Sequence, residues 1–446
     1  MDRLYIPVKY KLLIALLTAT TWLTLSLFIS YPWIQSLAEQ TGSIAAWFII
    51  FGIAIIPGFF NAFLITGLLL DNRPHYTQRK YPFYLPPVSV LIAAYNEETT
   101  IGDTIQSVLS QHYPGKLEII VIDDGSTDST AETVLNIIKD TPLFHNKATL
   151  KLLKQGENRG KAAALNNALG ISLYDTIITV DADTHIYGNS LARLVINFVD
   201  GPDNTAAVAG SVHVRNSRQS LLARLQEWDY FHGIAVVKRI QSLFQGTLVA
   251  QGAFTVYSKK AIEAVGGWPQ TVGEDIVLTW ALLKAGYRIS YAENAFVFTN
   301  VPEHYPQFYK QRLRWARGLI EAFKRYPSLI YAKKTNTPFI IFNSLFPFLD
   351  FVYLFAFLPG IISAIFFQNY AIAGLMTLSV LPLAILINIL MFSYQRRIFS
   401  QYGLKIRKNI AGLLLYTLLY QLLLSPASFI GYLSEIFNLK KKWGTK

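Results

Sequence analysis

The sequence predicts an α/β domain inserted between membrane-spanning helices. Three observations lead to this fold class. Long apolar runs lie near both ends of the chain, short β-branched runs alternate with helical stretches between them, and acidic residues follow three of the expected strands. Alternating strands and helices build a mostly parallel sheet that helices cover on both faces.

The composition indicates a membrane protein with a soluble part. Of the 446 residues 52% are hydrophobic and only 15% are charged. There is no cysteine, which excludes disulfides and thiolate metal sites. The net charge is +12, but lysine and arginine gather beside the apolar runs, as the positive-inside rule requires. Elsewhere no basic stripe occurs, so we expect no nucleic-acid partner.

Residues 1–80 are expected to hold two transmembrane helices and a linker. Lys11 to Ile34 and Ala45 to Leu70 are apolar runs, each long enough to cross a bilayer. Lysine and arginine precede the first run and follow the second, while the segment between the runs has neither. This asymmetry places the N-terminus and the chain after Leu70 in the cytoplasm of a multi-pass protein of the inner or plasma membrane.

Residues 81–330 are expected to form the cytoplasmic domain. Ligands of such sheets bind beyond the carboxyl ends of the strands. Asn96-Glu97, Asp123-Asp124 and the pair Asp181/Asp183 follow three strands, so these clusters should meet in one crevice. Two amphipathic segments come later, Leu221 to Phe244 and Tyr305 to Phe323. Each either lies along the membrane surface as an interfacial helix or packs on the sheet.

Residues 331–446 are expected to form C-terminal transmembrane helices. Three further apolar runs occur, and the basic loop QRRIFSQYGLKIRKN should be cytoplasmic. If all three runs cross the membrane, the tail LKKKWGTK lies outside, against the charge rule. The alternative is that one run is interfacial or broken. Asn343, Asp350 and Gln421 interrupt the runs, and such residues face a polar cavity or each other.

The stretch ITVDADTHIYG places two carboxylates at the end of a strand. Alternate strand residues point the same way, so Asp181 and Asp183 should project together and repel each other. A positive group is therefore expected between them. Carboxylate oxygens suit Mg²⁺ or Mn²⁺, which bind through one or two carboxylates and substrate phosphates. The alternative is a solvated turn.

Two strand-to-helix turns and one helix start carry further polar residues. In DDGSTD, Gly125 permits a positive φ and Asp124 can accept hydrogen bonds from a base or a ribose. An ordinary capped turn explains the same residues. Lys161 begins a helix, where its amine and the free backbone N–H groups favour phosphate.

The last two motifs are VGEDIVLTW and KQRLRWARG. Asp275 precedes an apolar helical stretch, either as an N-terminal cap or as a catalytic base. Gln311, Arg314 and Trp315 share one helical face, where arginine suits diphosphate and an indole suits the apolar face of a sugar. The alternative is an amphipathic helix with its tryptophan in the core or at the interface.

These motifs, in this order and approximate spacing, resemble the membrane-embedded processive family-two glycosyltransferases, which include cellulose, chitin and hyaluronan synthases. The resemblance covers about Val88 to Arg317 and extends to the flanking apolar runs. The compact size, the two N-terminal runs and KQRLRWARG are most like the bacterial poly-β-1,6-N-acetylglucosamine synthases. The resemblance implies a GT-A-like nucleotide-sugar-binding fold.

The resemblance also implies an activity. The enzyme would invert the anomeric carbon, depend on Mg²⁺ or Mn²⁺, and polymerise a UDP-sugar, preferably UDP-N-acetylglucosamine, into a β-linked exopolysaccharide of biofilms. Helices of residues 331–446 would form the channel for the growing polysaccharide, with the lipid membrane and small membrane or outer-face export proteins as partners.

The resemblance assigns roles to named residues. Asp275 would be the base, although this chain has Gly273 where the family has threonine in Thr-Glu-Asp. Gln311, Arg314 and Trp315 would bind diphosphate and the acceptor end, while Asp181 and Asp183 would bind metal, Asp181 also touching the donor. The other substrate-binding residues would be Ala93, Tyr95, Asn96, Glu97, Asp123, Asp124, Lys161, Gln251, Gly252 and Glu274.

Three other functions remain open. A non-processive transferase would add one sugar to a lipid acceptor, and a hyaluronan-, chitin- or cellulose-type synthase would use another sugar or linkage. The QxxRW helix and the several C-terminal runs favour a polymerase. A transporter or a nucleotide sensor would be non-enzymatic, and the presence of Asp275 argues against it.

Overall fold

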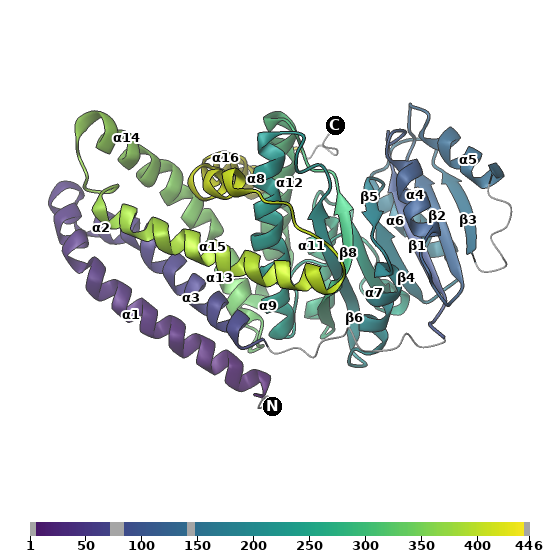
Figure 1. The fold of residues 1–446 in the computed structure, drawn as a ribbon, viewed down its shortest axis with the longest axis horizontal. Coiled ribbons are helices and arrows are strands. Elements are labelled where there is room, and N and C mark those ends of the chain that lie inside the picture. Colours follow the sequence, from purple (N-terminus) through teal and green to yellow (C-terminus); the bar gives the residue numbers. More distant parts are fainter. Residues whose placement is uncertain (1–5, 72–83, 141–147, 441–446) are drawn as a thin grey trace.

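The computed structural model describes residues 6–71, 84–140 and 148–440. Figure 1 shows a bundle of long helices beside an α/β domain built on one sheet. The basic residues that follow the second apolar run, the expected boundary at residues 80 and 81, and the tail after Lys440 lie outside the described residues.

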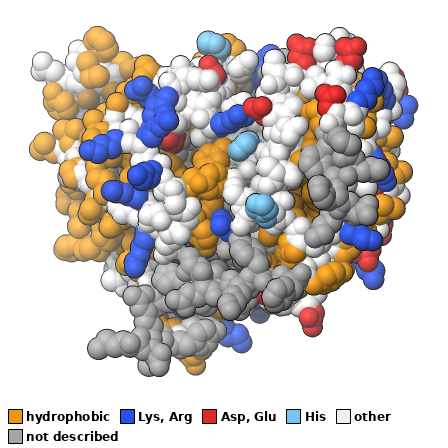
Figure 2. Space-filling model, turned by 45° about the vertical axis from the view of Figure 1, so that its right-hand side comes forward, with side chains coloured by type: hydrophobic (Ala, Val, Ile, Leu, Met, Phe, Trp, Pro, Cys, Tyr) orange, Lys and Arg blue, Asp and Glu red, His pale blue; other side chains and the backbone are white. Residues whose placement is uncertain are grey.

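The apolar runs of the sequence form the long helices of the bundle. Within the described residues, five helical segments are long and apolar enough to cross a membrane. In Figure 2 the hydrophobic end of the bundle gives way to a band of lysine and arginine side chains where the α/β domain begins. The bundle elements are α1 (Val8–Thr41), α2 (Ser43–Ile50), the π-helical turn η1 (Phe51–Ile55), α3 (Ile56–Leu69), α13 (Thr337–Val352), η5 (Tyr353–Phe357), α14 (Leu358–Phe367), α15 (Leu375–Gln401) and α16 (Ile410–Ile436).

The sheet has eight strands in the order β3-β2-β1-β4-β7-β6-β8-β5. The first four strands of this order are parallel, β7 is antiparallel to both of its neighbours, and β5 is antiparallel to β8. The first half of the sheet is thus parallel, as expected, and the second half is mixed, because β6 is also parallel to β8. The strands are β1 (Val88–Ala94), β2 (Leu117–Asp123), β3 (Ala148–Lys154), β4 (Thr176–Val180), β5 (Thr184–Ile186), β6 (Thr205–Val214), β7 (Phe254–Ser258) and β8 (Arg288–Thr299).

Helices cover the sheet because their apolar faces pack on its buried residues. Every residue of β2, β4 and β6 is buried. Such continuous burial is typical of strands that are covered on both faces. The helices of the α/β domain are α4 (Ile101–Leu109), α5 (Thr130–Asp140), α6 (Lys161–Ile171), α7 (Ser190–Val199), α10 (Lys259–Ala264) and α11 (Glu274–Lys284).

The two predicted amphipathic segments are helices that join the domain to the bundle. The first comprises α8 (Leu221–Asp229), η3 (Tyr230–Val236) and α9 (Val237–Leu243), and the second is α12 (Tyr305–Arg325). Buried Arg239 of α9 pairs with Asp71, just after α3, and with Glu293 of β8. The first segment therefore packs between the bundle and the sheet. This agrees with the alternative that it packs on the sheet.

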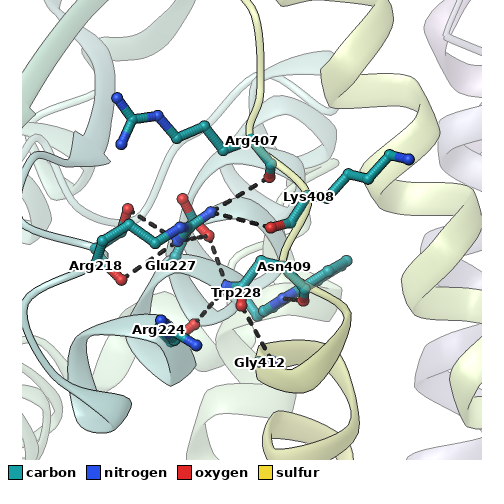
Figure 3. A network of polar contacts seen from close by, with 9 residues as sticks. Arg218, Arg224, Glu227, Trp228, Arg407, Lys408, Asn409 and Gly412 are labelled. Atoms are coloured by element: carbon teal, nitrogen blue, oxygen red, sulfur yellow. Dashed lines mark hydrogen bonds and ion pairs between the residues drawn. The ribbon is translucent and has the colours of Figure 1, made fainter.

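Helix α16 has a different course from the other bundle helices. Asn409 is the N-cap residue of α16, and its backbone carbonyl accepts a hydrogen bond from the indole N–H of Trp228 in α8. Figure 3 shows this junction. Farther along, the ring of Tyr420 lies 5.9 Å from that of Phe308, and Glu435 pairs with Arg317 of α12. Both ends of α16 thus contact the domain-side helices α8 and α12. Figure 1 shows α16 nearly end-on, while α1 and α15 run across the page.

The polar residues inside the apolar runs contact each other. Asp350 of α13 accepts hydrogen bonds from Gln421 at 2.9 Å, from Ser425 at 2.5 Å and from Tyr432 at 3.0 Å. For Asp350 and Gln421, the structure therefore shows a polar contact between packed helices.

Candidate functional site

The candidate site lies at the carboxyl ends of β1, β2 and β4, as the sequence predicts. One expectation is wrong, because β4 ends at Val180 and Asp181 to Asp183 form the turn before β5. Strand alternation therefore does not orient the two carboxylates. They remain close because the turn is tight, with the Thr184 N–H donating to the Asp181 carbonyl at 3.0 Å.

A lysine supplies the positive group that the sequence requires beside Asp181. Lys161 begins α6, and its ammonium contacts the Asp181 carboxylate and lies 3.6 Å from that of Glu274. Burial alone lowers the pKa of Lys161, but these carboxylates outweigh burial and raise it. A Cβ at Gly252 would lie 2.5 Å from Lys161 Nζ, so the glycine leaves room for the amine.

Asp183 has an excess of negative charge around it. Burial, Asp181 and Glu97 raise its pKa to about 6, while the Thr299 hydroxyl, which donates to Asp183 at 3.0 Å, opposes the rise. A hard divalent cation fits such a site, since it would neutralise carboxylates that repel each other. No cluster of three or more histidine, aspartate or glutamate side chains in the described chain could hold a metal, so a donor diphosphate would have to complete the coordination.

The turns after β1 and β2 are bound to each other. Asn96 has a φ of 54°, and its side-chain oxygen accepts from the Thr127 N–H at 2.9 Å. The Glu97 N–H donates to the Thr130 hydroxyl at 2.8 Å. The Asn96 side chain thus fixes the loop geometry in this structure. Tyr95, between Ala93 and this contact, is 38% exposed and available to a ligand.

The acidic pair after β2 organises the next loop. Asp123 accepts from the Ser126 N–H at 3.0 Å, and Asp124 accepts from the N–H groups of Arg159 and Gly160 at 2.9 and 2.8 Å. Burial raises the pKa of Asp124, and the two backbone bonds oppose this. A cavity of about 260 Å³ adjoins this loop, lined by residues 158–162 and 270–272. Lys161 is therefore reached from this cavity.

Asp275 lies in the first turn of α11. The residue before the helix is Gly273, so Asp275 is not the cap; it accepts a hydrogen bond from the Ile276 N–H at 2.8 Å. Burial raises the pKa of neighbouring Glu274 to about 7, with Lys161 opposing the rise and Asp275 adding to it. The two acids thus differ in their exposure to solvent: Glu274 is buried, and Asp275 is partly exposed.

One residue of the QRLRW motif, Arg314, acts on the same cluster from α12. The charge of Arg314 acts on Glu274, which places the guanidinium near the acids. Trp315 is 40% exposed. Gln311 is partly buried, and its side-chain oxygen has no hydrogen-bond partner among the described residues. α12 thus carries a cation near the acids and an exposed indole one residue later.

Gln251, a predicted substrate-binding residue, forms hydrogen bonds with neighbouring strands. Its amide donates to the Gly210 carbonyl of β6 at 2.5 Å, and its backbone carbonyl accepts from the Thr255 hydroxyl at 2.6 Å. The side-chain oxygen is buried without a partner within the described chain. Contact between Gln251 and an acceptor stays a prediction.

Sequence reasoning missed three residues beside the site. The Thr299 hydroxyl of β8 donates a hydrogen bond to Asp183. Nothing in the sequence relates Thr299 to the DAD turn. Lys238 of α9 is buried, and burial lowers its pKa to about 7 despite the opposing charge of Asp275. Arg312 lies within the QRLRW motif but was not distinguished from its neighbours.

Comparison with known proteins identifies the family of the chain. Residues 89–266 match the family described as Glycosyl transferase family 2. A poly-beta-1,6-N-acetyl-D-glucosamine synthase of Staphylococcus epidermidis is 33% identical over 344 residues, which cover 73% of this chain and 77% of the relative. A synthase of the same name from Staphylococcus aureus (strain COL) is 35% identical over 277 residues, 60% of this chain and 65% of the relative.

A solved structure has the same fold. The mannosyltransferase of Pyrobaculum calidifontis, in complex with GDP-Man and Mn²⁺, superposes with a TM-score of 0.63 at 20% identity, covering 89% of this chain and 99% of that chain. The fold is thus GT-A-like, with long apolar helices flanking it. The chain is a glycosyltransferase, and it belongs to family two, where it is similar to the poly-β-1,6-N-acetyl-D-glucosamine synthases.

Proposed function

We propose that the protein is an inverting, processive synthase that polymerises UDP-N-acetylglucosamine into a β-linked exopolysaccharide and passes it across the membrane. The observation that carries this proposal is the cluster of Lys161, Asp181 and Glu274, on which Arg314 acts from the helix that also carries the exposed Trp315. The cluster offers cations for a diphosphate beside carboxylates, and α12 adds a flat surface for a sugar one residue after Arg314. The names of the staphylococcal relatives supply the sugar.

The donor would bind along the carboxyl ends of the strands. The Lys161 amine and the first turn of α6 would contact the diphosphate, with Arg314 on its other side. Asp124 and Tyr95 would contact the nucleoside, Ala93 and Asp123 would line this part of the site, and Asn96 and Glu97 would hold the loops in place.

Asp183 and Asp181 would hold Mg²⁺ or Mn²⁺ together with the diphosphate. The ion would supply positive charge to the leaving group. A divalent cation suits this position because the carboxylates of Asp181 and Glu97 crowd around Asp183. The mannosyltransferase of similar fold has Mn²⁺ in its complex with GDP-Man.

Asp275 would act as the general base. It would accept the proton of the acceptor hydroxyl, whose oxygen attacks the anomeric carbon from the side opposite the diphosphate. As the new C–O bond forms, the bond to UDP breaks, and UDP leaves with the electron pair. Trp315 would support the acceptor sugar, beside Gln311, Gln251 and Gly252. Glu274, buried beside Lys161, would orient the lysine.

The membrane arrangement follows from the course of the helices. We place the domain of residues 81–330 in the cytoplasm, with four crossings made by α1, α2–α3, α13–α14 and α15. Helix α16 would lie at the inner face, because both of its ends contact α8 and α12. Its outer row, Ile410, Leu414, Leu418 and Leu422, is 41–67% exposed and would face lipid. The tail would then be cytoplasmic, as the charge rule requires.

The purified full-length chain, incubated with a panel of UDP-sugars and Mg²⁺ or Mn²⁺, tests the proposal. UDP release and product mass are the readouts. We expect release with UDP-N-acetylglucosamine and products of many sugars. Release without products longer than one added sugar would contradict processivity, and no release from any UDP-sugar would contradict the activity.

A further inference from the structure

Arg312, the second residue of the QRLRW motif, lies against the tryptophan of that motif. Its guanidinium carbon is 4.1 Å from the centroid of the Trp315 ring and 5.0 Å from that of Phe308. Side chains on a helix point back over the preceding turn, so Trp315 reaches the residue three positions earlier. Arg312 is 4% exposed and Trp315 is 40% exposed. The guanidinium therefore covers part of the indole and leaves the rest open.

Arg312 pairs with a residue of α8, and α16 packs beside it. Asp229, the last residue of α8, lies 2.9 Å from it as an ion pair, with 5% of the Arg312 side chain and 14% of the Asp229 side chain exposed. Tyr420 of α16 packs on Phe308 with 5.9 Å between the ring centroids, and Phe308 in turn lies against the Arg312 guanidinium. An ion pair from α8 thus holds the guanidinium behind Trp315, and α16 packs on the ring beside it.

A buried ion pair is weak evidence for a role in stability. Removing two charges from water costs about as much as their attraction returns, and apolar residues of similar volume often stabilise a protein equally well. What arginine adds here is shape, because its planar group can stack on an indole while it pairs with a carboxylate, and lysine cannot do both. The geometry therefore suits orientation of the indole.

We propose that Arg312, held by Asp229, is a positioning residue that fixes the Trp315 ring for the sugar at the end of the growing polysaccharide. It acts on the acceptor through Trp315 and does not contact the donor. This inference rests on the proposed function, in which Trp315 supports the acceptor.

The test uses the full-length protein in detergent, a β-1,6-linked N-acetylglucosamine trimer as acceptor, and saturating UDP-N-acetylglucosamine. Arg312→Lys and Asp229→Asn should each raise the KM for the trimer about tenfold. They should leave kcat within twofold and UDP affinity unchanged. In a Trp315→Phe background, Arg312→Lys should change KM less than twofold, because residues acting as one unit are not additive.

Arg193→Lys is the matched control. It removes another arginine stacked on a ring, that of Tyr402 at 4.3 Å, far from α12 in the sequence and outside the proposed site. We expect no change in the KM for the trimer in this variant.

Three results would overturn the inference. An unchanged KM in both variants would show that the pair does not act on the acceptor. An equal rise in KM with and without the Trp315 ring would show that Arg312 does not act through it. Loss of UDP binding in both variants would reveal a general structural role. The proposed function fails separately, if the wild-type protein transfers no sugar to the trimer.

Discussion

Gly273 and Gly318 meet backbone to backbone. A Cβ on Gly273 would lie 2.5 Å from the Gly318 Cα, and one on Gly318 would lie 2.9 Å from the Gly273 Cα. Gly273 precedes Asp275 by two residues, and Gly318 follows Trp315 by three, so this contact fixes the acidic turn of α11 against the motif of α12.

Gly318→Ala and Gly273→Thr should therefore reduce the rate of sugar transfer. A methyl group at either position forces the helices apart, and a displacement of about 1 Å in an active site can cost about 100-fold in rate. We expect at least a tenfold loss of kcat, measured as UDP release. Gly170→Ala is the control, since nothing lies within 4 Å of a Cβ there. Full activity of Gly318→Ala would refute the need for this close contact.

Lys161→Met should weaken binding of UDP at least tenfold at neutral pH. The change removes a cation from the proposed diphosphate site and leaves Asp181 and Glu274 to repel the donor. Calorimetric titration with UDP measures the effect. Lys139→Met, an exposed lysine at the end of α5, should bind UDP normally. Wild-type affinity in Lys161→Met would mean that the lysine serves only the fold.

His213 should make the protein sensitive to acid. Burial in β6 lowers its pKa from 6.5 to about 3, so below pH 6.5 the unfolded chain binds a proton that the folded chain does not. Stability due to this residue is complete above pH 6.5 and falls by about 1.4 kcal/mol per pH unit down to about pH 3.

His213→Gln should remove this part of the pH dependence. The measurement is the thermal unfolding midpoint at pH 7.5 and pH 5.5, where the wild-type protein should lose about 2–4 °C more than the variant. His112→Gln, at an exposed position, should keep the wild-type difference. An identical difference in all three proteins would contradict the assignment to His213.

The proposed four crossings place the two ends of α15 on opposite sides of the membrane and both ends of α16 on the cytoplasmic side. The chain has no cysteine, so single cysteines report the side directly. In intact cells a membrane-impermeant maleimide should label Tyr370→Cys, between α14 and α15, and spare Lys440→Cys until the membrane is permeabilised. Labelling of Lys440→Cys in intact cells would mean that α16 crosses the bilayer.

The sequence predicts the elements well and the contacts between them less well. Apolar length identifies the long helices, and polar residues after β-branched runs identify the sheet edge. Hydropathy could not show that α16 packs against α8 and α12. A helix that lies on the protein at the membrane surface can be as apolar as a helix that crosses the lipid. The DAD turn was expected on a strand since its preceding residues are continuous with β4.

Pairings across the fold are the part that a single sequence could not provide. The sequence indicates that a cation should neutralise Asp181, but only the fold brings Lys161 to it, and only the fold joins Thr299 to Asp183. The Gly273–Gly318 contact is of the same kind, because each glycine alone looks like a local feature.

Asp275 carries the central claim, and one variant tests it most directly. Asp275→Asn keeps the shape of the side chain and removes the proton acceptor. UDP release at saturating UDP-N-acetylglucosamine and acceptor is compared with UDP affinity measured on the same preparation. The account predicts that release falls at least 1,000-fold (about 4 kcal/mol) while UDP affinity stays within twofold. Sugar transfer at the wild-type rate by Asp275→Asn would contradict it.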